Sequence, residues 1–204
     1  MLGAAIVIAA LDWMSVAATV RWLEYLTKPG FMLALIALAV AIHPVSSAQR
    51  ALFLVALTFG LISDVFLMVP HDLFLLGLGA ALVEHLAYIA GFRVRELHVA
   101  LLLVAAAIVL VSVVLVLPAI YRALQRDHPK LVAPVIAYVA VFGVMVASAG
   151  GTGSLLALAG ALLFFYSDAI LAWNRFVTPL PFGRVVNIVP YHVGQALLVL
   201  SLAS

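Results

Sequence analysis

The chain has 204 residues, of which 68% are hydrophobic and only 9% charged, and its formal net charge is +2. This is more apolar surface than a water-soluble fold can cover, so the composition excludes a soluble protein and predicts an integral membrane protein that crosses the bilayer several times. The ten basic residues are scattered, which gives no indication of nucleic-acid binding, and the absence of cysteine excludes disulfides, thiolate metal ligands and cysteine nucleophiles.

Apolar runs of roughly 17 to 21 residues, the length that crosses a hydrocarbon core as a helix, alternate with short polar breaks along the chain. We expect the first run to be retained as a span, because it lacks the basic start of a cleaved signal and carries Asp12. The second run is short, and we expect it to be tilted or to begin earlier. The eight predicted transmembrane helices cover residues 2–20, 30–42, 51–69, 73–92, 99–117, 131–148, 154–173 and 185–202.

The breaks between these runs hold proline, glycine and histidine residues typical of helix ends. One of them, Lys28-Pro29-Gly30, places the lysine before the second span. No break is long enough to separate domains. We therefore expect residues 1–204 to form a single all-α, polytopic membrane domain with eight transmembrane helices.

The distribution of basic residues predicts an orientation, because cytoplasmic loops are enriched in lysine and arginine. The side reached after the first, third, fifth and seventh spans holds seven of them, and the opposite side holds Arg50, Arg93 and Arg95. We expect the protein to lie in the cytoplasmic membrane of a bacterium, with both termini on the outer side. The seven residues are Arg21, Lys28, Arg122, Arg126, Lys130, Arg175 and Arg184.

Acidic residues are distributed differently, since four of the eight fall inside the apolar runs: Asp12, Asp64, Glu84 and Asp168. An ionisable group inside a bilayer costs roughly 2.5 to 3.5 kcal/mol on insertion scales and indicates function by default. All ten basic residues lie outside the predicted spans or at their margins. We therefore expect these acids to lack a buried cationic partner.

A Ser-Asp pair occurs in two of the predicted spans. Ser63-Asp64 in the third is repeated 104 residues later by Ser167-Asp168 in the seventh. In each case the next helix carries a histidine, within His85-x-x-Tyr88 and His192-x-x-Gln195. Because four spans separate the equivalent helices, the pattern predicts two parallel four-helix repeats about an axis near the membrane normal, although two divergent packing units would give the same pattern.

The two aspartates are predicted to lie at similar depth. Each is about 13 residues into its span and therefore about 20 Å from the outer side, at a rise of 1.5 Å per residue. If the two helices are neighbours, Asp64 and Asp168 face one cavity, where repulsion and burial would leave one carboxyl group protonated and the other ionised near neutral pH. The alternative is that each aspartate binds a neighbouring helix independently.

Several short motifs occur in order along the chain: Thr27-Lys28-Pro29, Ser63-Asp64 with Phe66-Leu67-Met68, Gly77 to Tyr88 with Glu84-His85, Pro134-Val135 with Tyr138, and Ser167-Asp168 followed by Asn174-Arg175-Phe176. Together they resemble the YhhN family of integral membrane lysoplasmalogenases over nearly the whole chain. The resemblance implies hydrolysis of the vinyl ether bond of lysoplasmalogens, which releases a fatty aldehyde and a glycerophospho-ethanolamine or glycerophospho-choline. It also implies that Asp64 and Asp168 are the catalytic pair.

Vinyl ether hydrolysis fits these residues chemically. Protonation of the alkene carbon creates an oxocarbenium ion, water captures the ion to give a hemiacetal, and the hemiacetal collapses to aldehyde and alcohol. This sequence needs an acid and an anion, which a protonated and an ionised carboxyl group supply. We therefore predict an aspartate dyad that needs no cofactor and no metal, without assigning which aspartate is the acid.

Other polar residues are candidates for substrate binding from the predicted cavity wall or the cytoplasmic interface. For the buried ones, an interhelical hydrogen bond is an equal alternative, and for Lys28 so is anchoring at the membrane surface. The candidates are Lys28, Ser63, Glu84, His85, Tyr88, Tyr138, Ser167, Asn174, His192 and Gln195.

Three other functions stay open at the level of sequence. The first is a metal-dependent enzyme, because suitable metal ligands occur at Asp64, Asp168, His85 and His192, although no His-Glu-x-x-His spacing occurs. Repeated helices with intramembrane acids also suit a proton-coupled transporter of a small or lipid-like substrate. A membrane scaffold would tolerate loss of both aspartates.

The expected partners are a lysophospholipid substrate and membrane lipid, with no nucleic acid, and the sequence makes no prediction of oligomeric state.

Overall fold

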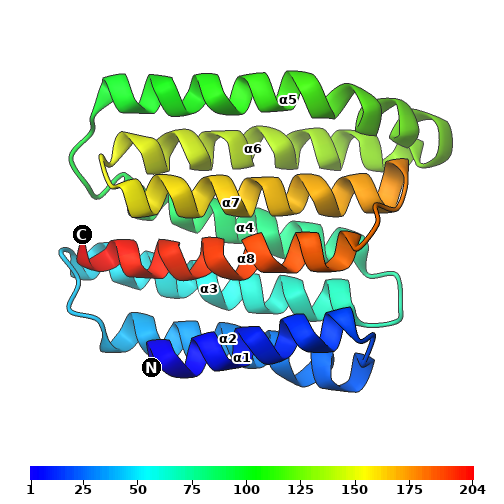
Figure 1. The fold of residues 1–204 in the computed structure, drawn as a ribbon. Helices are drawn as coiled ribbons and strands as arrows, with labels where there is room; N and C mark the ends of the chain where they lie inside the picture. The colour runs from blue at the N-terminus through cyan, green and yellow to red at the C-terminus, as the bar shows by residue number, and fades with distance from the viewer.

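A computed structural model describes residues 1–204 as an all-helical bundle with no strands. Consecutive helices run antiparallel, so that both termini lie at one end of the bundle (Figure 1). The helices are α1 (Leu2–Ala17), α2 (Arg21–Ala41), α3 (Ser47–Met68), α4 (Phe74–Phe92), α5 (Val99–Asp127), α6 (Val132–Gly151), α7 (Leu155–Ala172) and α8 (Gly183–Leu200), with a π-helical turn η2 (Trp173–Val177) and 3₁₀ turns η1 (Pro129–Leu131) and η3 (Ser201–Ala203).

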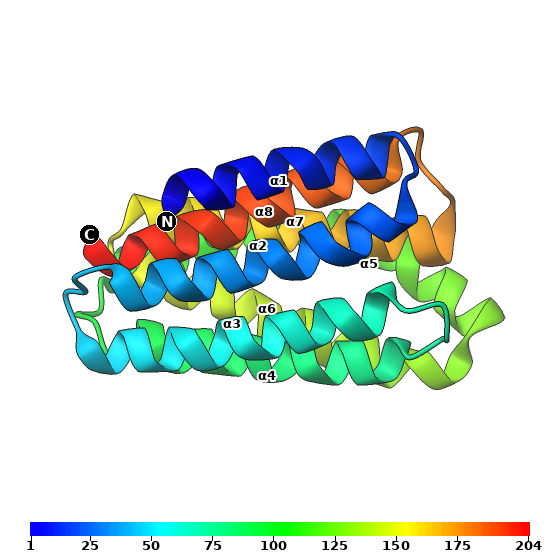
Figure 2. The ribbon, with the colours of Figure 1, turned by 90° about the horizontal axis from the view of Figure 1, so that it is seen from below.

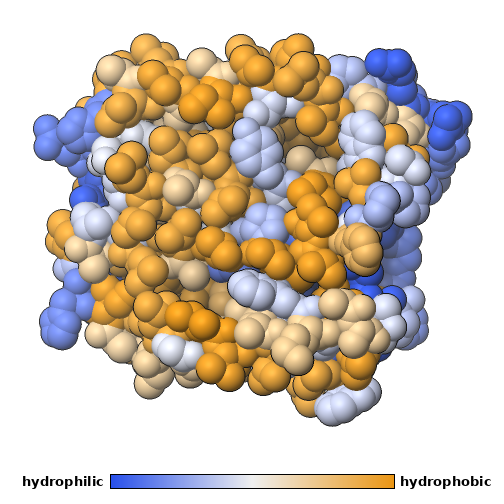
Figure 3. Space-filling view, in the orientation of Figure 1, coloured by the Kyte–Doolittle hydropathy of each residue, from blue (hydrophilic) through white to orange (hydrophobic).

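Seven of these helices, α2 to α8, are long and apolar enough to cross a membrane, whereas α1 is apolar but has only 16 residues. An apolar band covers the middle of the bundle between two hydrophilic ends (Figure 3). Large side chains such as Leu103, Leu110 and Leu115 on α5 are more than half exposed within this band. The protein is therefore an integral, multi-pass membrane protein of the all-α class, as predicted.

The second span begins earlier than its apolar run, which is one of the two alternatives that the short run predicts. Helix α2 begins at Arg21 and continues through Lys28, Pro29 and Gly30 to Ala41. A proline inside a helix removes one backbone hydrogen bond, but membrane helices tolerate it when neighbouring groups satisfy the freed carbonyl. Lys28 consequently lies inside the membrane-spanning segment, although the proline and glycine that follow it predict a break between helices.

The predicted end of the fifth span is wrong. Helix α5 continues past Leu117 for almost three further turns, through Pro118, and ends at Asp127. The last turns of α5 carry Arg122 and Arg126, which are exposed at the end of the bundle opposite the termini. This end also holds the connections that follow α1, α3 and α7 (Figure 1).

Two tightly packed hairpins, α3–α4 and α7–α8, organise the interior (Figure 2). In α7–α8 the backbones meet at Gly160 and Gly194, where a Cβ built on either residue would lie 2.8 Å from the carbonyl oxygen of the other. Such contacts between small residues are typical of helix pairs in membranes, because close approach maximises packing. Helix α8 also packs against α1 and α2, so the last helix joins both halves of the bundle.

The serine of each Ser-Asp pair links the two helices of its hairpin. Ser63 Oγ on α3 donates to the carbonyl of Gly77 on α4 at 2.9 Å, and Ser167 Oγ on α7 donates to the carbonyl of Asn187 on α8 at 2.9 Å. The two pairs therefore make equivalent contacts. Each fixes the rotation of its helix, and with it the direction of the aspartate that follows.

Candidate active site

Asp64 and Asp168 line one cavity of about 290 Å³. The cavity lies toward the basic end of the bundle, since Asp64 is about one turn from the end of α3 and Asp168 about one turn from the end of α7. Residues from every helix contribute to its wall. The two Ser-Asp helices thus present their carboxylates to a shared space.

Asp64 forms an ion pair inside the bundle. Its side chain is 6% exposed, the Nζ of Lys28 lies 2.9 Å from Oδ1, and the hydroxyl of Tyr191 donates to Oδ2 at 2.5 Å. The Lys28 ammonium also lies 5.4 Å from the centre of the Tyr191 ring. The expectation that the intramembrane acids lack a buried cation is therefore wrong for Asp64, because Lys28 lies within α2.

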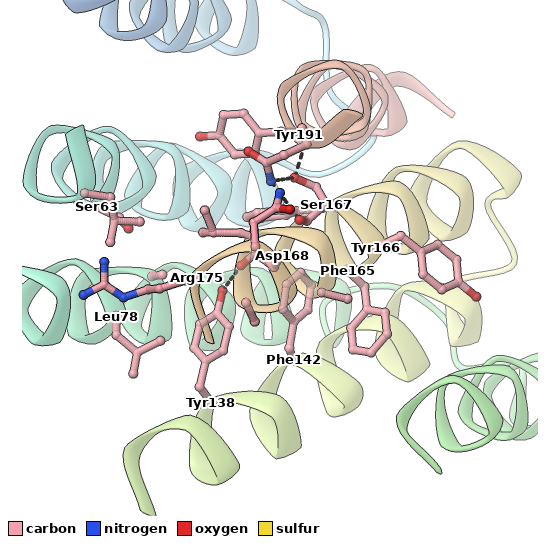
Figure 4. Close-up of a pocket in the computed structure, with 18 of the residues that line it drawn as sticks. Ser63, Leu78, Tyr138, Phe142, Phe165, Tyr166, Ser167, Asp168, Arg175 and Tyr191 are labelled. Atoms are coloured by element: carbon pink, nitrogen blue, oxygen red, sulfur yellow. Dashed lines mark hydrogen bonds between the residues drawn. The ribbon is translucent and has the colours of Figure 1, made fainter. Parts of the chain in front are cut away.

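Asp168 has a different environment, without a cation in ion-pair contact. The hydroxyl of Tyr138 on α6 donates to its Oδ2 (Figure 4), and Nε2 of His85 on α4 lies 2.9 Å from the same hydroxyl oxygen. The Asp168 carboxylate therefore faces a hydroxyl group where Asp64 faces an ammonium group. The cavity thus combines two carboxylates that have unlike partners.

A third acid, Glu84, also lines the cavity and is almost completely buried. Its Oε1 accepts a hydrogen bond from Gln195 Nε2 at 2.6 Å, and Gln195 Oε1 accepts one from the Tyr88 hydroxyl at 2.7 Å. Gly60 on α3 leaves room for this side chain, since a Cβ there would lie 2.6 Å from Glu84 Oε1. Tyr88 and Gln195 therefore orient Glu84 from behind the cavity wall.

The ten predicted substrate-binding residues divide into two groups. Lys28, Ser63, Glu84, Tyr138, Ser167 and Asn174 line the cavity. The other four, His85, Tyr88, His192 and Gln195, do not.

His192 and Asn174 have structural partners. Trp13 Nε1 donates to His192 Nδ1 at 3.0 Å, and His192 Nε2 lies 3.7 Å from the buried carboxylate of Asp12, so this histidine faces α1. Asn174 Oδ1 accepts from the backbone N–H of Leu180 at 2.8 Å and fixes the connection between α7 and α8. Neither side chain contacts Asp64 or Asp168.

Some residues of the site are not apparent from the sequence. Tyr191 binds Asp64, Asn187 Nδ2 donates to Ser167, and Arg184 pairs with Glu24, across 160 positions of the chain. The only local signal is that Asn187 and Tyr191 are four residues apart and so share one face of α8. Asp64, Asp168, His85 and His192, the alternative metal ligands, form no group of three or more that could hold a metal ion.

The cavity has an apolar part that reaches the side of the bundle. It is lined by Val113, Val116 and Leu117 on α5 and by Phe165 on α7. At its rim Ser112 Oγ and the hydroxyl of the partly exposed Tyr166 are 2.9 Å apart. On this face of the molecule weakly hydrophilic side chains interrupt the apolar surface around a hollow (Figure 3). The cavity therefore opens between α5 and α7 into the apolar band.

Comparison with known proteins identifies relatives over most of the chain. Lysoplasmalogenase TMEM86B of Rattus norvegicus is 32% identical over 185 residues, which cover 88% of this chain and 73% of the relative. Lysoplasmalogenase TMEM86B of Homo sapiens is 31% identical over 197 residues, covering 94% and 76%. Lysoplasmalogenase TMEM86A of Homo sapiens is 32% identical over 176 residues, covering 84% and 68%.

No solved structure matches this chain. The profile of the YhhN family, in contrast, matches residues 23–202. This range includes the cavity-lining residues from Glu24 to Tyr191. The resemblance that the sequence motifs carry is thus confirmed, and this chain belongs to the YhhN family.

Proposed function

We propose that this protein is a lysoplasmalogenase-like ether hydrolase of the bacterial cytoplasmic membrane. Its substrate is a lysoplasmalogen, and its products are a fatty aldehyde and glycerophospho-ethanolamine or glycerophospho-choline. The names of its relatives support this function. The observation that carries it is the presence in one cavity of two aspartates with unlike partners, Asp64 beside Lys28 and Asp168 beside Tyr138.

The first chemical step assigns a proton to Asp168. Its carboxyl group donates this proton to the alkene carbon that is not bonded to oxygen, and the positive charge that results is shared between the other alkene carbon and the ether oxygen. Tyr138, supported by His85, holds Oδ2 of Asp168, and in this step Oδ1 carries the proton. A positioned acid of this kind contributes roughly 10²- to 10⁴-fold in rate.

The second step assigns the anion to Asp64. Its charge stabilises the oxocarbenium ion, and it accepts a proton from the water that attacks this ion. The hemiacetal then loses its hydroxyl proton as the bond to the glycerol oxygen breaks and that oxygen gains a proton. Return of one proton from Asp64 to Asp168 restores the enzyme, so the net reaction consumes one water.

The shape of the cavity suits a substrate with one long chain. The hydrocarbon tail lies between α5 and α7 and extends through the lateral opening into the bilayer, while the linkage reaches the aspartates. The tail moves between two apolar surroundings, the bilayer and the cavity, so van der Waals packing holds the chain without specific polar groups.

We also propose an organisation for the bundle. The protein forms one domain of eight spans, with α1 as a short first span. The two halves, which end in α3–α4 and α7–α8, are parallel repeats. The equivalent bonds of Ser63 and Ser167 across these hairpins support the repeat. In this scheme Ser63, Ser167, His85, Tyr88 and Gln195 position the groups that face the substrate.

The test is release of long-chain aldehyde from lysoplasmenyl-ethanolamine by purified protein in detergent. The saturated alkyl-ether analogue, which lacks the alkene, should not be cleaved. In D₂O the aldehyde, trapped at once by reduction, should carry one deuterium on the carbon next to the carbonyl. No aldehyde from folded protein would contradict the proposal, and gradient-driven uptake into liposomes without aldehyde would support a proton-coupled transporter.

A further inference from the structure

The cavity has a charged mouth that the chemistry of the two aspartates does not use. Arg21 and Glu24 at the start of α2 and Arg184 at the start of α8 all line the cavity. Arg184 forms an ion pair with Glu24, whose side chain is only 11% exposed, whereas the Arg184 side chain is 44% exposed. Arg21 is exposed and forms no ion pair.

The other cations that line the cavity are occupied. The Lys28 ammonium is bound to Asp64, and the Arg175 guanidinium is paired with Asp72 and lies 4.3 Å from the centre of the Phe74 ring. The mouth therefore offers one free guanidinium, a second that is half-exposed, and one nearly buried carboxylate. This set of charges matches a zwitterion with a phosphate and an ammonium group.

Helix geometry connects the mouth to the reacting groups. Arg21, Glu24 and Lys28 follow each other on one face of α2, at the spacing i, i+3, i+7. Arg184, Asn187 and Tyr191 do the same on α8. Because Lys28 and Tyr191 both bind Asp64, each row leads from the mouth to this carboxylate over two helical turns, about 10 Å.

We propose that Arg21, Glu24 and Arg184 form the site for the polar head group of a zwitterionic lysophospholipid. Arg21 and Arg184 bind the phosphodiester, and Glu24 binds the ammonium of ethanolamine or choline. The inference rests on the proposed function. In a lysoplasmalogen only the three-carbon glycerol backbone separates the vinyl ether oxygen from the phosphate ester, so a head group at the mouth places the alkene beside Asp64 and Asp168.

The first test compares two alkenyl lipids, lysoplasmenyl-ethanolamine and the corresponding alkenylglycerol, which has no phosphate. Arg21→Ala should raise the KM for the phospholipid about tenfold at nearly constant kcat, because a charge-assisted contact outside the reacting centre is lost. Its KM for alkenylglycerol should not change. Arg122→Ala, which removes an exposed arginine from the same end but outside the cavity, is the matched control.

Arg21 has no ion-pair partner in the protein, so Arg21→Ala should fold. Glu24 and Arg184 are removed together, as the double variant Glu24→Gln with Arg184→Gln, to avoid a buried unpaired charge. The double variant should show the same selective rise in KM. Equal KM values for wild type and both variants on the phospholipid would overturn the inference while leaving the hydrolase activity in place.

A second readout does not depend on catalysis. The saturated alkyl-ether lysophosphoethanolamine should raise the thermal unfolding temperature of the wild type more than that of Arg21→Ala, because a ligand stabilises the folded state in proportion to its affinity. Inorganic phosphate at millimolar concentration should not reproduce this shift, whereas an equal shift by phosphate would indicate a free-phosphate site. Equal stabilisation of wild type and variant by the lipid would contradict the head-group site even if no vinyl ether is hydrolysed.

Discussion

At the scale of single residues, the two aspartates differ through their partners. Both follow a serine that binds the next helix, and both lie in the wall of one cavity. Asp64, however, faces the Lys28 ammonium and the Tyr191 hydroxyl, whereas Asp168 faces only the Tyr138 hydroxyl. One repeated motif thus places two carboxylates in unlike surroundings, because the side chains around them are not repeated. In the proposed mechanism Asp64 is the anion and Asp168 is the acid.

Lys28→Met is the substitution that tests this asymmetry. It removes the cation that pairs with Asp64 and leaves the helix-forming stem in place. The proposed mechanism therefore predicts that aldehyde release falls about 100-fold, at the level of an acid–base contribution. Loss of one partner of a buried ion pair also destabilises by about 3–5 kcal/mol, so folding is checked by thermal unfolding in detergent.

The control for this substitution is Lys130→Met, at an exposed position of the 3₁₀ turn at the same end of the bundle. It should retain full turnover. Wild-type turnover in Lys28→Met would show that Asp64 does not act as the anion.

The sequence predicts which acids share the cavity better than it predicts the partners of these acids. Repetition of Ser-Asp in two apolar runs is visible along the chain, and both carboxylates reach one cavity. Tyr191 lies 127 positions from Asp64, and no local pattern links them. Lys28 was placed outside the membrane because the proline and glycine that follow it are typical of a helix end in water.

At the scale of elements, the hairpin α7–α8 carries three groups of the site on two backbones in direct contact. Asp168 lies on α7, and Asn187 and Tyr191 lie on α8. The contact of Gly160 with Gly194 sets the separation of these helices, because the two atoms nearest to a Cβ built on either glycine, at 2.8 and 2.9 Å, are backbone atoms. A side chain there has no flexible neighbour to displace.

Gly160→Ala should therefore force the helices apart. The new Cβ would lie 2.8 Å from the Gly194 carbonyl oxygen, and overpacking of this kind destabilises by about 1–3 kcal/mol. We expect a lower unfolding temperature and a fall in kcat, because Tyr191 moves relative to Asp168. Gly79→Ala is the matched control, since no atom lies within 4 Å of its added Cβ. Equal unfolding temperatures for the two variants would contradict this description of the hairpin.

Helix boundaries show where sequence patterns suffice. Among the proline residues that fall between the predicted spans, Pro44, Pro70 and Pro179 do separate helices. Pro29 and Pro118 lie inside helices instead. The proline residues do not differ in kind, so the outcome depends on whether neighbouring helices satisfy the carbonyl that each proline frees, and this is a property of tertiary packing.

At the scale of the whole molecule, charge divides the bundle into two ends. The end reached after the odd-numbered helices holds the mouth of the cavity and most of the basic residues, while the termini lie at the opposite end (Figure 1). By the tendency of basic residues to stay in the cytoplasm, we expect the cavity to receive water from the cytoplasmic side and its lipid chain from the bilayer.

The chain allows a direct test of this orientation because it contains no cysteine. A cysteine at Glu96, in the connection before α5, should react with a membrane-impermeant maleimide in intact spheroplasts. A cysteine at Asp127, at the other end of α5, should react only after the membrane is permeabilised. Both positions are exposed, so the reverse pattern would place the mouth outside.

The most direct measurement of the central claim is aldehyde release from lysoplasmenyl-ethanolamine by purified wild type, Asp64→Asn and Asp168→Asn, with a chelator present. Asp127→Asn, an exposed acid at the same end outside the cavity, is the control. We predict turnover by the wild type and the control, and a loss of about 100-fold or more in each of the other two. Folding of each variant is checked by thermal unfolding in detergent, because Asp64→Asn removes one partner of the buried ion pair with Lys28. Substantial turnover by either Asp64→Asn or Asp168→Asn would contradict the dyad.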